Sequence, residues 1–208
     1  NGGGVQTEGK QKAGEKIVVK TDIVIADIDT VGGDLRRLEV LLHPDKEEKS
    51  KAFALLQSRS DHVYVAQAGL IGEGLTSHKT HYTTDSRSYD LASGQEKIEV
   101  RLHAPVTDGV RVTKIYTFHR GSYIVDVSFA VVNQGPTAIQ PFSYFQVLRD
   151  SQPPVGSVFM VPTYTGAALY TEQEKFKKIE YSALDKGNAS YPKNADNGWI
   201  AMLQHYFL

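Results

Sequence analysis

The chain lacks cysteine altogether, and it has little of several other features that point directly to a chemistry. Without cysteine there is no disulfide framework, no thiolate zinc site and no cysteine nucleophile. The 23 Lys and Arg residues nearly balance the 24 Asp and Glu residues, so the net charge is −1. Such a balance gives no basic field that would attract nucleic acid or anionic lipid. The longest apolar runs have a few residues, far fewer than the roughly 20 that a membrane-spanning helix needs.

The composition is that of a globular protein with a sizeable core. The chain has 208 residues, of which 40% are hydrophobic and 23% charged, enough for one domain or two small ones. Residues 1–14 are polar and glycine-rich, as in a flexible linker, and contain no signal-peptide pattern. No domain-sized shift in composition follows, so we expect a single domain over residues 15–208.

The dominant pattern beyond the linker is an alternation of period two, which places side chains on opposite faces of a sheet. In residues 96–103, for example, Ile98, Val100 and Leu102 alternate with charged residues. Residues 120–122 predict a hairpin turn between two long strands. Strand-like runs occupy residues 16–19, 23–28, 38–43, 62–67, 96–103, 110–119, 123–132, 139–148, 157–161, 167–170 and 199–207. This number of strands predicts a mostly β fold, an antiparallel β-sandwich.

Helical signal is confined to one segment. Thr171 and Glu174 have the spacing of a capping box, and Phe176 and Ile179 continue at helical spacing. This pattern predicts one short amphipathic helix within residues 172–186. The run after Ile179 also fits the beginning of a strand.

The sequence contains only isolated candidates for a catalytic or metal site. His78 and His81 have a spacing that can serve a metal, but Asp85 is the only further ligand type nearby, and zinc needs three or four ligands. His103 and His119 fall on the charge-bearing phase of their strands, which favours exposed positions. The chain also has no nucleophile-elbow sequence. We therefore expect no metal, no cofactor, no catalytic residue and no enzymatic activity.

The last segment is apolar on both faces. Trp199 and its neighbours up to Leu208 alternate without a polar side, and a strand of this kind is usually covered on both faces. Trp199 is predicted to anchor this strand in the core. Because domains rarely end in apolar sequence, we expect a domain that is incomplete at its C-terminal end, with an open sheet edge or an exposed apolar groove near this strand.

Several segments, taken together and in this order, resemble the large periplasmic domain of the YidC membrane protein insertase family of Gram-negative bacteria. They are residues 19–22 (Val-Lys-Thr-Asp), 30–34 (Thr-Val-Gly-Gly-Asp), 114–123 (Lys-Ile-Tyr-Thr-Phe-His-Arg-Gly-Ser-Tyr), 166–171 (Gly-Ala-Ala-Leu-Tyr-Thr), 174–176 (Glu-Lys-Phe) and 198–207 (Gly-Trp-Ile-Ala-Met-Leu-Gln-His-Tyr-Phe). The order and spacing of these segments, which span nearly the whole chain, carry the resemblance.

The resemblance implies a β-supersandwich similar to the galactose-mutarotase-like fold, at the periplasmic face of the bacterial inner membrane. In that family the membrane part carries out insertion. The periplasmic domain is an accessory module that contacts SecD/SecF or the Sec translocon, and its cleft is thought to hold extended, substrate-like ligands. The implied function is assistance in membrane protein insertion and folding, as a chaperone-like module, through protein–protein contacts.

Within this interpretation, the charged face of the predicted helix is the candidate partner-binding surface. Lys175 and Lys178 would contact the partner, while Phe176 and Ile179 would hold the helix to the sandwich. The alternative is a solvated helix without a partner. Two other functions stay open: a carbohydrate-binding or mutarotase-like enzyme, which would need a His paired with a Glu across a pocket, and a chaperone that binds client strands at a sheet edge.

Overall fold

The computed structural model describes residues 14–45, 48–150 and 164–204. The chain forms two compact units, residues 1–149 (unit 1) and 150–208 (unit 2), and each is described by itself. Across the described ranges, no helix has the length and apolar character needed to cross a bilayer. Nearly all of the predicted linker lies outside these ranges, and the single-domain boundary at residues 15–208 stays a prediction.

Unit 1 contains a seven-stranded sheet in the order β11-β5-β4-β3-β2-β1-β7. Its strands are β1 (Lys16–Lys20), β2 (Val24–Asp29), β3 (Leu35–Pro44), β4 (Ala52–Ser58), β5 (Val63–Ile71), β7 (Ser88–Asp90) and β11 (Phe142–Arg149). The pairings are antiparallel except for the short parallel pair β1–β7. The sequence pattern did not predict β4 or β7.

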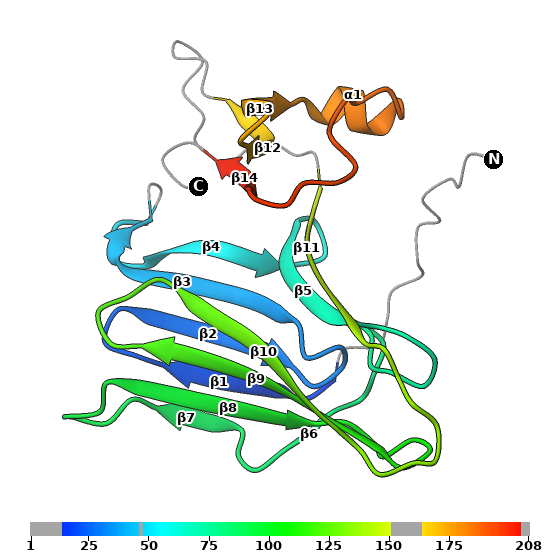
Figure 1. Ribbon diagram of the computed structural model, residues 1–208. Coiled ribbons are helices and arrows are strands. Elements are labelled where there is room, and N and C mark those ends of the chain that lie inside the picture. Colours follow the sequence, from blue (N-terminus) through cyan, green and yellow to red (C-terminus); the bar gives the residue numbers. More distant parts are fainter. Residues whose placement is uncertain (1–13, 46–47, 151–163, 205–208) are drawn as a thin grey trace. The chain divides into compact units, whose positions relative to one another are not determined.

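A four-stranded antiparallel sheet, in the order β10-β9-β8-β6, completes unit 1. It consists of β6 (Thr83–Thr84), β8 (Lys97–His103), β9 (Val110–His119) and β10 (Val125–Asn133). Figure 1 shows its green strands in front of the blue strands of the larger sheet. In β8, Val100 and Leu102 are fully buried while Lys97 and Arg101 are exposed, as the alternation predicts. The expected mostly β, sandwich-like fold is confirmed.

The hairpin turn predicted at residues 120–122 lies between β9 and β10. Gly121 adopts φ +64°, in the left-handed region that favours glycine. Its N–H points to the carboxylate of Asp22, with distances of 3.1 and 3.0 Å to the two oxygens. The turn of one sheet is thereby bonded to the connection between β1 and β2 of the other sheet.

Unit 2 is built on a three-stranded antiparallel sheet in the order β13-β12-β14. Its elements are β12 (Thr165–Thr171), β13 (Lys175–Ile179), the short helix α1 (Tyr181–Asp185) and β14 (Trp199–Gln204). The helix exists within the predicted range of 172–186 but is much shorter than that range. The first part of the range is strand β13, so the helical interpretation of Phe176 and Ile179 is wrong.

The capping-box signal at Thr171 has a different structural meaning. The N–H of Glu174 donates to Oγ1 of Thr171 at 3.0 Å, as a helix cap would require, but this bond lies in the turn between β12 and β13. A Thr hydroxyl satisfies a nearby backbone N–H in a turn as well as at a helix start. The predicted hydrogen bond therefore exists, but the element that follows it is a strand and not a helix.

Strand β14 contradicts one expectation about the end of the chain. Among the described residues it lies at an edge of the three-stranded sheet; the predicted open edge itself stays a prediction. Trp199, however, is not a core anchor, because 42% of its surface is exposed. The predicted strand at residues 157–161 and the last residues of the chain lie outside the described ranges. Incompleteness at the C-terminal end stays a prediction.

Candidate functional site

The two candidate partner-binding lysines lie on strand β13 and point to opposite faces of the sheet. Side chains alternate along a strand, so Lys178 shares a face with Phe176, whereas Lys175 shares the other face with the buried Ile179. Lys175 is at the start of the strand with φ +57°. The expected single charged face of a helix is therefore wrong in its geometry. Lys178 is the lysine that stands beside aromatic side chains.

Three aromatic rings form a row across one face of the unit 2 sheet. Tyr170 on β12 is the register partner of both Phe176 on β13 and Trp199 on β14. The rings of Tyr170 and Trp199 stack with centroids 5.9 Å apart and an interplanar angle of 15°, and Phe176 is tilted against Trp199 at 6.0 Å. Phe176 and Trp199 are 49% and 42% exposed. The row is therefore a surface feature.

Lys178 extends this aromatic row through Tyr164. Its Nζ lies 4.7 Å from the centroid of the Tyr164 ring, within cation–π range. The Tyr164 hydroxyl is within 2.8 Å of two carbonyls, those of Ala167 and Ile179, which fixes the ring. Burial, followed by the charge of nearby Glu180, raises the pKa of Tyr164.

We call the surface formed by Tyr164, Tyr170, Phe176, Lys178 and Trp199 the aromatic face. The small residues Ala168 and Ala201 separate these side chains on the same side of the sheet. Exposed apolar clusters with a polar border are typical of protein contact sites. The sequence pattern predicted Lys178 at a contact surface but favoured inward-facing positions for Phe176 and Trp199, because large aromatic side chains are usually buried.

Unit 1 contains a different feature, a buried ammonium group between its two sheets. Lys114 of β9 is 0% exposed. Its Nζ donates to the carbonyls of Gly32 at 3.1 Å and Ala68 at 2.9 Å. Two positions along the same strand, the hydroxyl of Tyr116 donates to the carbonyl of Gly33 at 2.5 Å. Strand β9 is thereby bonded to the β2–β3 turn and to β5 of the facing sheet.

The charge of Lys114 is balanced through space by a buried carboxylate. Asp34 is 1% exposed and accepts a bond from Nε2 of Gln67 at 2.6 Å. Burial lowers the pKa of Lys114 to about 8, partly offset by the charge of Asp34, and burial raises the pKa of Asp34. The Lys114 ammonium group and the Asp34 carboxylate are enclosed, so they hold the sandwich together and are not accessible to a large ligand. The sequence signal was the position of Lys114 on the inward phase of β9, between Val112 and Tyr116.

The sequence segments that carried the family resemblance in unit 1 meet in this region. Lys114 and Tyr116 contact the Gly32–Gly33 turn, and Gly121 at the end of the same segment contacts Asp22. Segments that are far apart in the sequence are thus one structural unit, organised by β9. Spacing alone could not reveal these contacts, because they cross from one sheet to the other.

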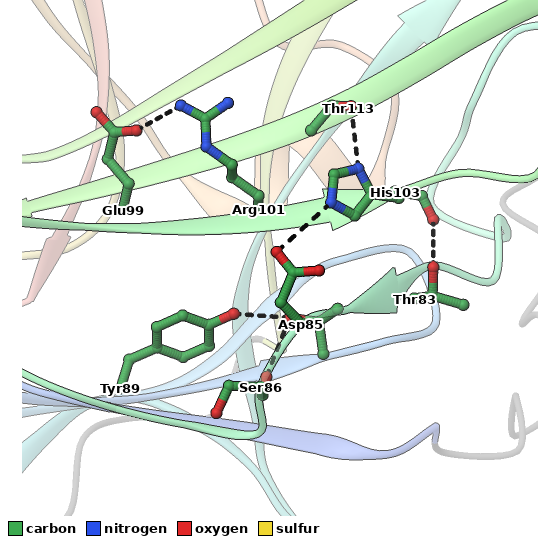
Figure 2. A network of polar contacts seen from close by, with 9 residues as sticks. Thr83, Asp85, Ser86, Tyr89, Glu99, Arg101, His103 and Thr113 are labelled. Carbon is green, nitrogen blue, oxygen red and sulfur yellow. Dashed lines mark hydrogen bonds and ion pairs between the residues drawn. The ribbon is translucent and has the colours of Figure 1, made fainter.

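The candidate histidines lie in polar networks at the surface. Figure 2 shows Nδ1 of His103 beside Oγ1 of Thr113, at 3.2 Å, and Nε2 facing Asp85 at 3.9 Å. His119 approaches Asp126 at 2.7 Å. Both side chains are a little over one third exposed, in agreement with the expected surface positions.

The other metal candidates do not converge either. Nδ1 of His78 lies 3.3 Å from the hydroxyl of Tyr144, and the backbone of His81 forms a bridge with Val31. In the ranges that the structure describes, no three His, Cys, Asp or Glu side chains are placed to hold a metal ion.

A groove of about 410 Å³ lies over strands β1 to β4 of unit 1. Its carboxylates face cations of the same protein: Asp27 faces Lys16 at 3.5 Å and Arg37 at 3.4 Å, and Asp29 faces Arg36 at 2.8 Å. No histidine is among the described residues that line it. The groove therefore lacks the His–carboxylate pair that a mutarotase-like reaction needs.

These features define a β-sandwich domain with an internally bonded core in unit 1 and an exposed aromatic face in unit 2. Residues 16–208 match the YidC periplasmic domain family. The chain belongs to this family.

Individual relatives agree with this assignment. The chain is 70% identical over its whole length to the membrane protein insertase YidC of Nitrosospira multiformis, covering 37% of that protein. It is 56% identical to the YidC of Nitrosomonas europaea, over 94% of this chain and 32% of the relative. It is 47% identical to the YidC of Methylobacillus flagellatus, over 98% of this chain and 36% of the relative. The chain thus spans about a third of the length of these relatives.

Proposed function

We propose that this chain is an accessory domain of an inner-membrane protein insertase. It acts at the periplasmic face of the membrane, where it assists the insertion and folding of membrane proteins through contacts with SecD/SecF and other components of the Sec translocon. Family membership supports the setting. The observation that carries the proposal is the aromatic face, where exposed rings stand beside Lys178.

The chemistry of this face suits a protein partner. Trp and Tyr supply large contact areas with few rotatable bonds, and they are the residue types that most often dominate protein–protein binding energy. Lys175 and Lys178 are both exposed. Lys178 adds positive charge to the aromatic face, and Lys175, at the start of the same strand, adds positive charge at its border. Unfolded membrane protein segments, which are apolar, are a second class of partner for the same rings.

The test is a charge reversal in the full-length protein. Lys175→Glu combined with Lys178→Glu should reduce co-purification of SecD/SecF from solubilised membranes, because positive charge at the contact becomes negative. Lys193→Glu, an exposed residue of the same unit outside the sheet, is the matched control and should have no effect. Equal recovery of SecD/SecF with the double variant and the control would refute the proposal.

We also propose that the domain has no enzymatic activity of its own. The groove of unit 1 holds no histidine among its described lining residues, and its carboxylates are engaged by cations. An assay of aldohexose mutarotation by polarimetry should give the spontaneous rate. A faster, saturable rate would support the carbohydrate alternative instead.

A further inference from the structure

The segment that leads into β14 contains an asparagine followed directly by a glycine, Asn197-Gly198. The backbone nitrogen after an asparagine can attack the Cγ of the side-chain amide. A Cβ on the following residue hinders this approach, so the Asn-Gly pair is the one most prone to the reaction. Asn197 is exposed and belongs to no helix or strand, so water reaches its amide. The other Asn-Gly pair of the sequence, Asn1-Gly2, lies outside the described residues.

The fold requires the glycine of this pair. Gly198 has φ +139°, and a Cβ added to it would lie 2.1 Å from the carbonyl oxygen of Tyr170 on the neighbouring strand β12. Any larger residue would therefore push β14 away from β12. The close approach of the two strands thus keeps the attacking nitrogen free of a side chain.

The amide that would be attacked is held by a hydrogen-bond donor. The N–H of Glu172, at the start of the turn between β12 and β13, donates to Oδ1 of Asn197 at 3.3 Å. A backbone N–H aimed at a carbonyl oxygen stabilises the negative charge that develops there when a nucleophile adds to the carbon. The contact that positions the Asn197 side chain therefore also activates it.

Other asparagines of the chain lack this combination. The backbone nitrogens that follow Asn133 and Asn188 each donate to a backbone carbonyl, at 3.0 and 3.1 Å. Within the described ranges, the N–H of Gly198 donates no such bond. Asn194 is exposed and lies outside helices and strands, as Asn197 does, but an alanine follows it. Asn194 is therefore a matched internal control.

We propose that Asn197 is a site of spontaneous modification, promoted by the N–H of Glu172, at which the side-chain amide becomes a carboxylate. The nitrogen of Gly198 forms a bond to Cγ of Asn197, and its proton leaves with the amide nitrogen as ammonia, which closes a succinimide ring. Water then opens the ring at either carbonyl and leaves aspartate or isoaspartate. The balance is one water taken up for one ammonia released, and the reaction needs no partner protein, so it is independent of the proposed function.

Both products alter the start of β14. Each adds a negative charge close to Glu172, which is itself an exposed carboxylate. Isoaspartate also places an additional methylene in the main chain directly before Trp199, the register partner of Tyr170. The longer main chain no longer fits the close approach of Gly198 to β12, so conversion should weaken the pairing of β14.

Isotope-labelled peptide mapping of the folded full-length insertase tests the proposal. The protein is incubated in buffer made with H₂¹⁸O, digested with trypsin in ordinary water and analysed by tandem mass spectrometry, so that the label marks only conversion before digestion. No Lys or Arg lies between Asn194 and Asn197, so both are measured on one peptide. Asn197 should convert faster than Asn194 by about tenfold or more, with ¹⁸O in the new carboxylate and isoaspartate methyltransferase labelling part of the product. Equal rates at the two positions, or no conversion at Asn197, would overturn the proposal.

The role of the Glu172 N–H is tested by its removal. Glu172→Pro eliminates the donor in a residue type that turns favour, and the residue before it lies in a strand, as proline requires. Conversion of Asn197 should slow by about threefold or more, whereas Glu172→Ala, which keeps the N–H, should leave the rate unchanged. Equal rates in the two variants would overturn the proposed promotion by the fold.

A measurement on the wild type keeps this test valid should Glu172→Pro fail to fold. Urea breaks the contact between Glu172 and Asn197, so the ratio of the conversion rates of Asn197 and Asn194 should be lower in the unfolded protein than in the folded protein. A ratio that is equal or higher in urea would likewise overturn the promotion by the fold.

Discussion

Unit 1 and unit 2 place their most distinctive side chains in opposite environments. In unit 1 a lysine, an aspartate and a tyrosine hydroxyl are buried between two sheets, where they bond to backbone carbonyls and to Gln67. In unit 2 a tryptophan and a phenylalanine lie at the surface of a small sheet. A charged group inside and aromatic groups outside reverse the usual distribution, and the two reversals have different causes.

The buried lysine of unit 1 serves the architecture. Its ammonium group donates to two backbone carbonyls and joins β9 to the opposite sheet. The exposed rings of unit 2 contact one another across neighbouring strands, and about half of the surface of Phe176 and Trp199 stays exposed. The comparison separates unit 1, where buried polar contacts join two sheets, from unit 2, for which we propose a contact role. Each half of that statement can be tested separately.

The largest effect is expected for Lys114→Met. Methionine fills a similar volume but donates no hydrogen bond, so the carbonyls of Gly32 and Ala68 lose their donor and Asp34 loses its neighbouring cation. We expect the free energy of unfolding to fall by about 3 kcal/mol, measured by urea denaturation. Lys97→Met, at an exposed position of the neighbouring strand β8, is the control and should change it by less than about 0.5 kcal/mol. Equal stabilities of the two variants would show that Lys114 is dispensable.

The stability of the protein should also depend on pH because of the Lys114 ammonium group. The pKa of Lys114 is about 8 in the folded protein and 10.5 in an ordinary lysine, so between these values the unfolded chain binds more protons. The contribution of Lys114 to stability therefore rises with pH across this window, by up to about 3 kcal/mol. Urea denaturation of wild type and Lys114→Met at pH 7.5 and pH 9.5 isolates this term. A stability difference that stays constant or shifts in favour of the variant would contradict the burial of a charged lysine.

A substitution in the β9–β10 hairpin turn tests the second contact between the two sheets of unit 1, the bond from Gly121 to Asp22. Apart from its two neighbours in the chain, no described residue places an atom within 4 Å of a Cβ added at Gly121, so Gly121→Val acts mainly through the φ of +64°. We expect a loss of about 1 kcal/mol or more in the free energy of unfolding. Gly121→Asn tolerates this backbone region better and should cost less. An unchanged melting temperature for Gly121→Val would remove the turn assignment.

For unit 2 the expected effect of removing an exposed ring on stability is moderate. Trp199→Ala should lower the free energy of unfolding by about 1–3 kcal/mol, because it removes two ring pairs of about 0.5–1.5 kcal/mol each from a side chain that is already 42% exposed. Leu169→Ala, on the central strand of the same sheet and 7% exposed, should cost about 2–5 kcal/mol. A larger loss for Trp199→Ala than for Leu169→Ala would mean that Trp199 is a core residue after all.

Much of unit 1 could be predicted from alternation, since strands such as β8 and β9 keep a strict period of two between a core and water. The failures have physical reasons. In β13, the apolar Phe176 and Ile179 happen to stand three residues apart, and Thr171 makes the bond of a helix cap within a turn. Lys175 and Lys178 consequently seemed to share one helical face, whereas a strand separates them.

The contacts between sheets could not be predicted at all. The bond from Gly121 to Asp22 and those from Lys114 to Gly32 and Ala68 depend on which strands face each other, and no local pattern encodes that. Trp199 was misplaced for a related reason. Its strand is apolar on both sides, so the pattern gave no indication of which face is left open.

The most direct test of the central claim uses the fact that the chain contains a single tryptophan. With 5-fluorotryptophan incorporated, Trp199 should give one ¹⁹F NMR resonance, accessible to a soluble paramagnetic quencher, when the chain is alone. Addition of purified SecD–SecF complex should shift or broaden this resonance and protect it from the quencher, and Lys178→Glu should weaken the response. A resonance already protected in the free chain, or unchanged at saturating complex, would contradict the assignment of unit 2 as the contact surface.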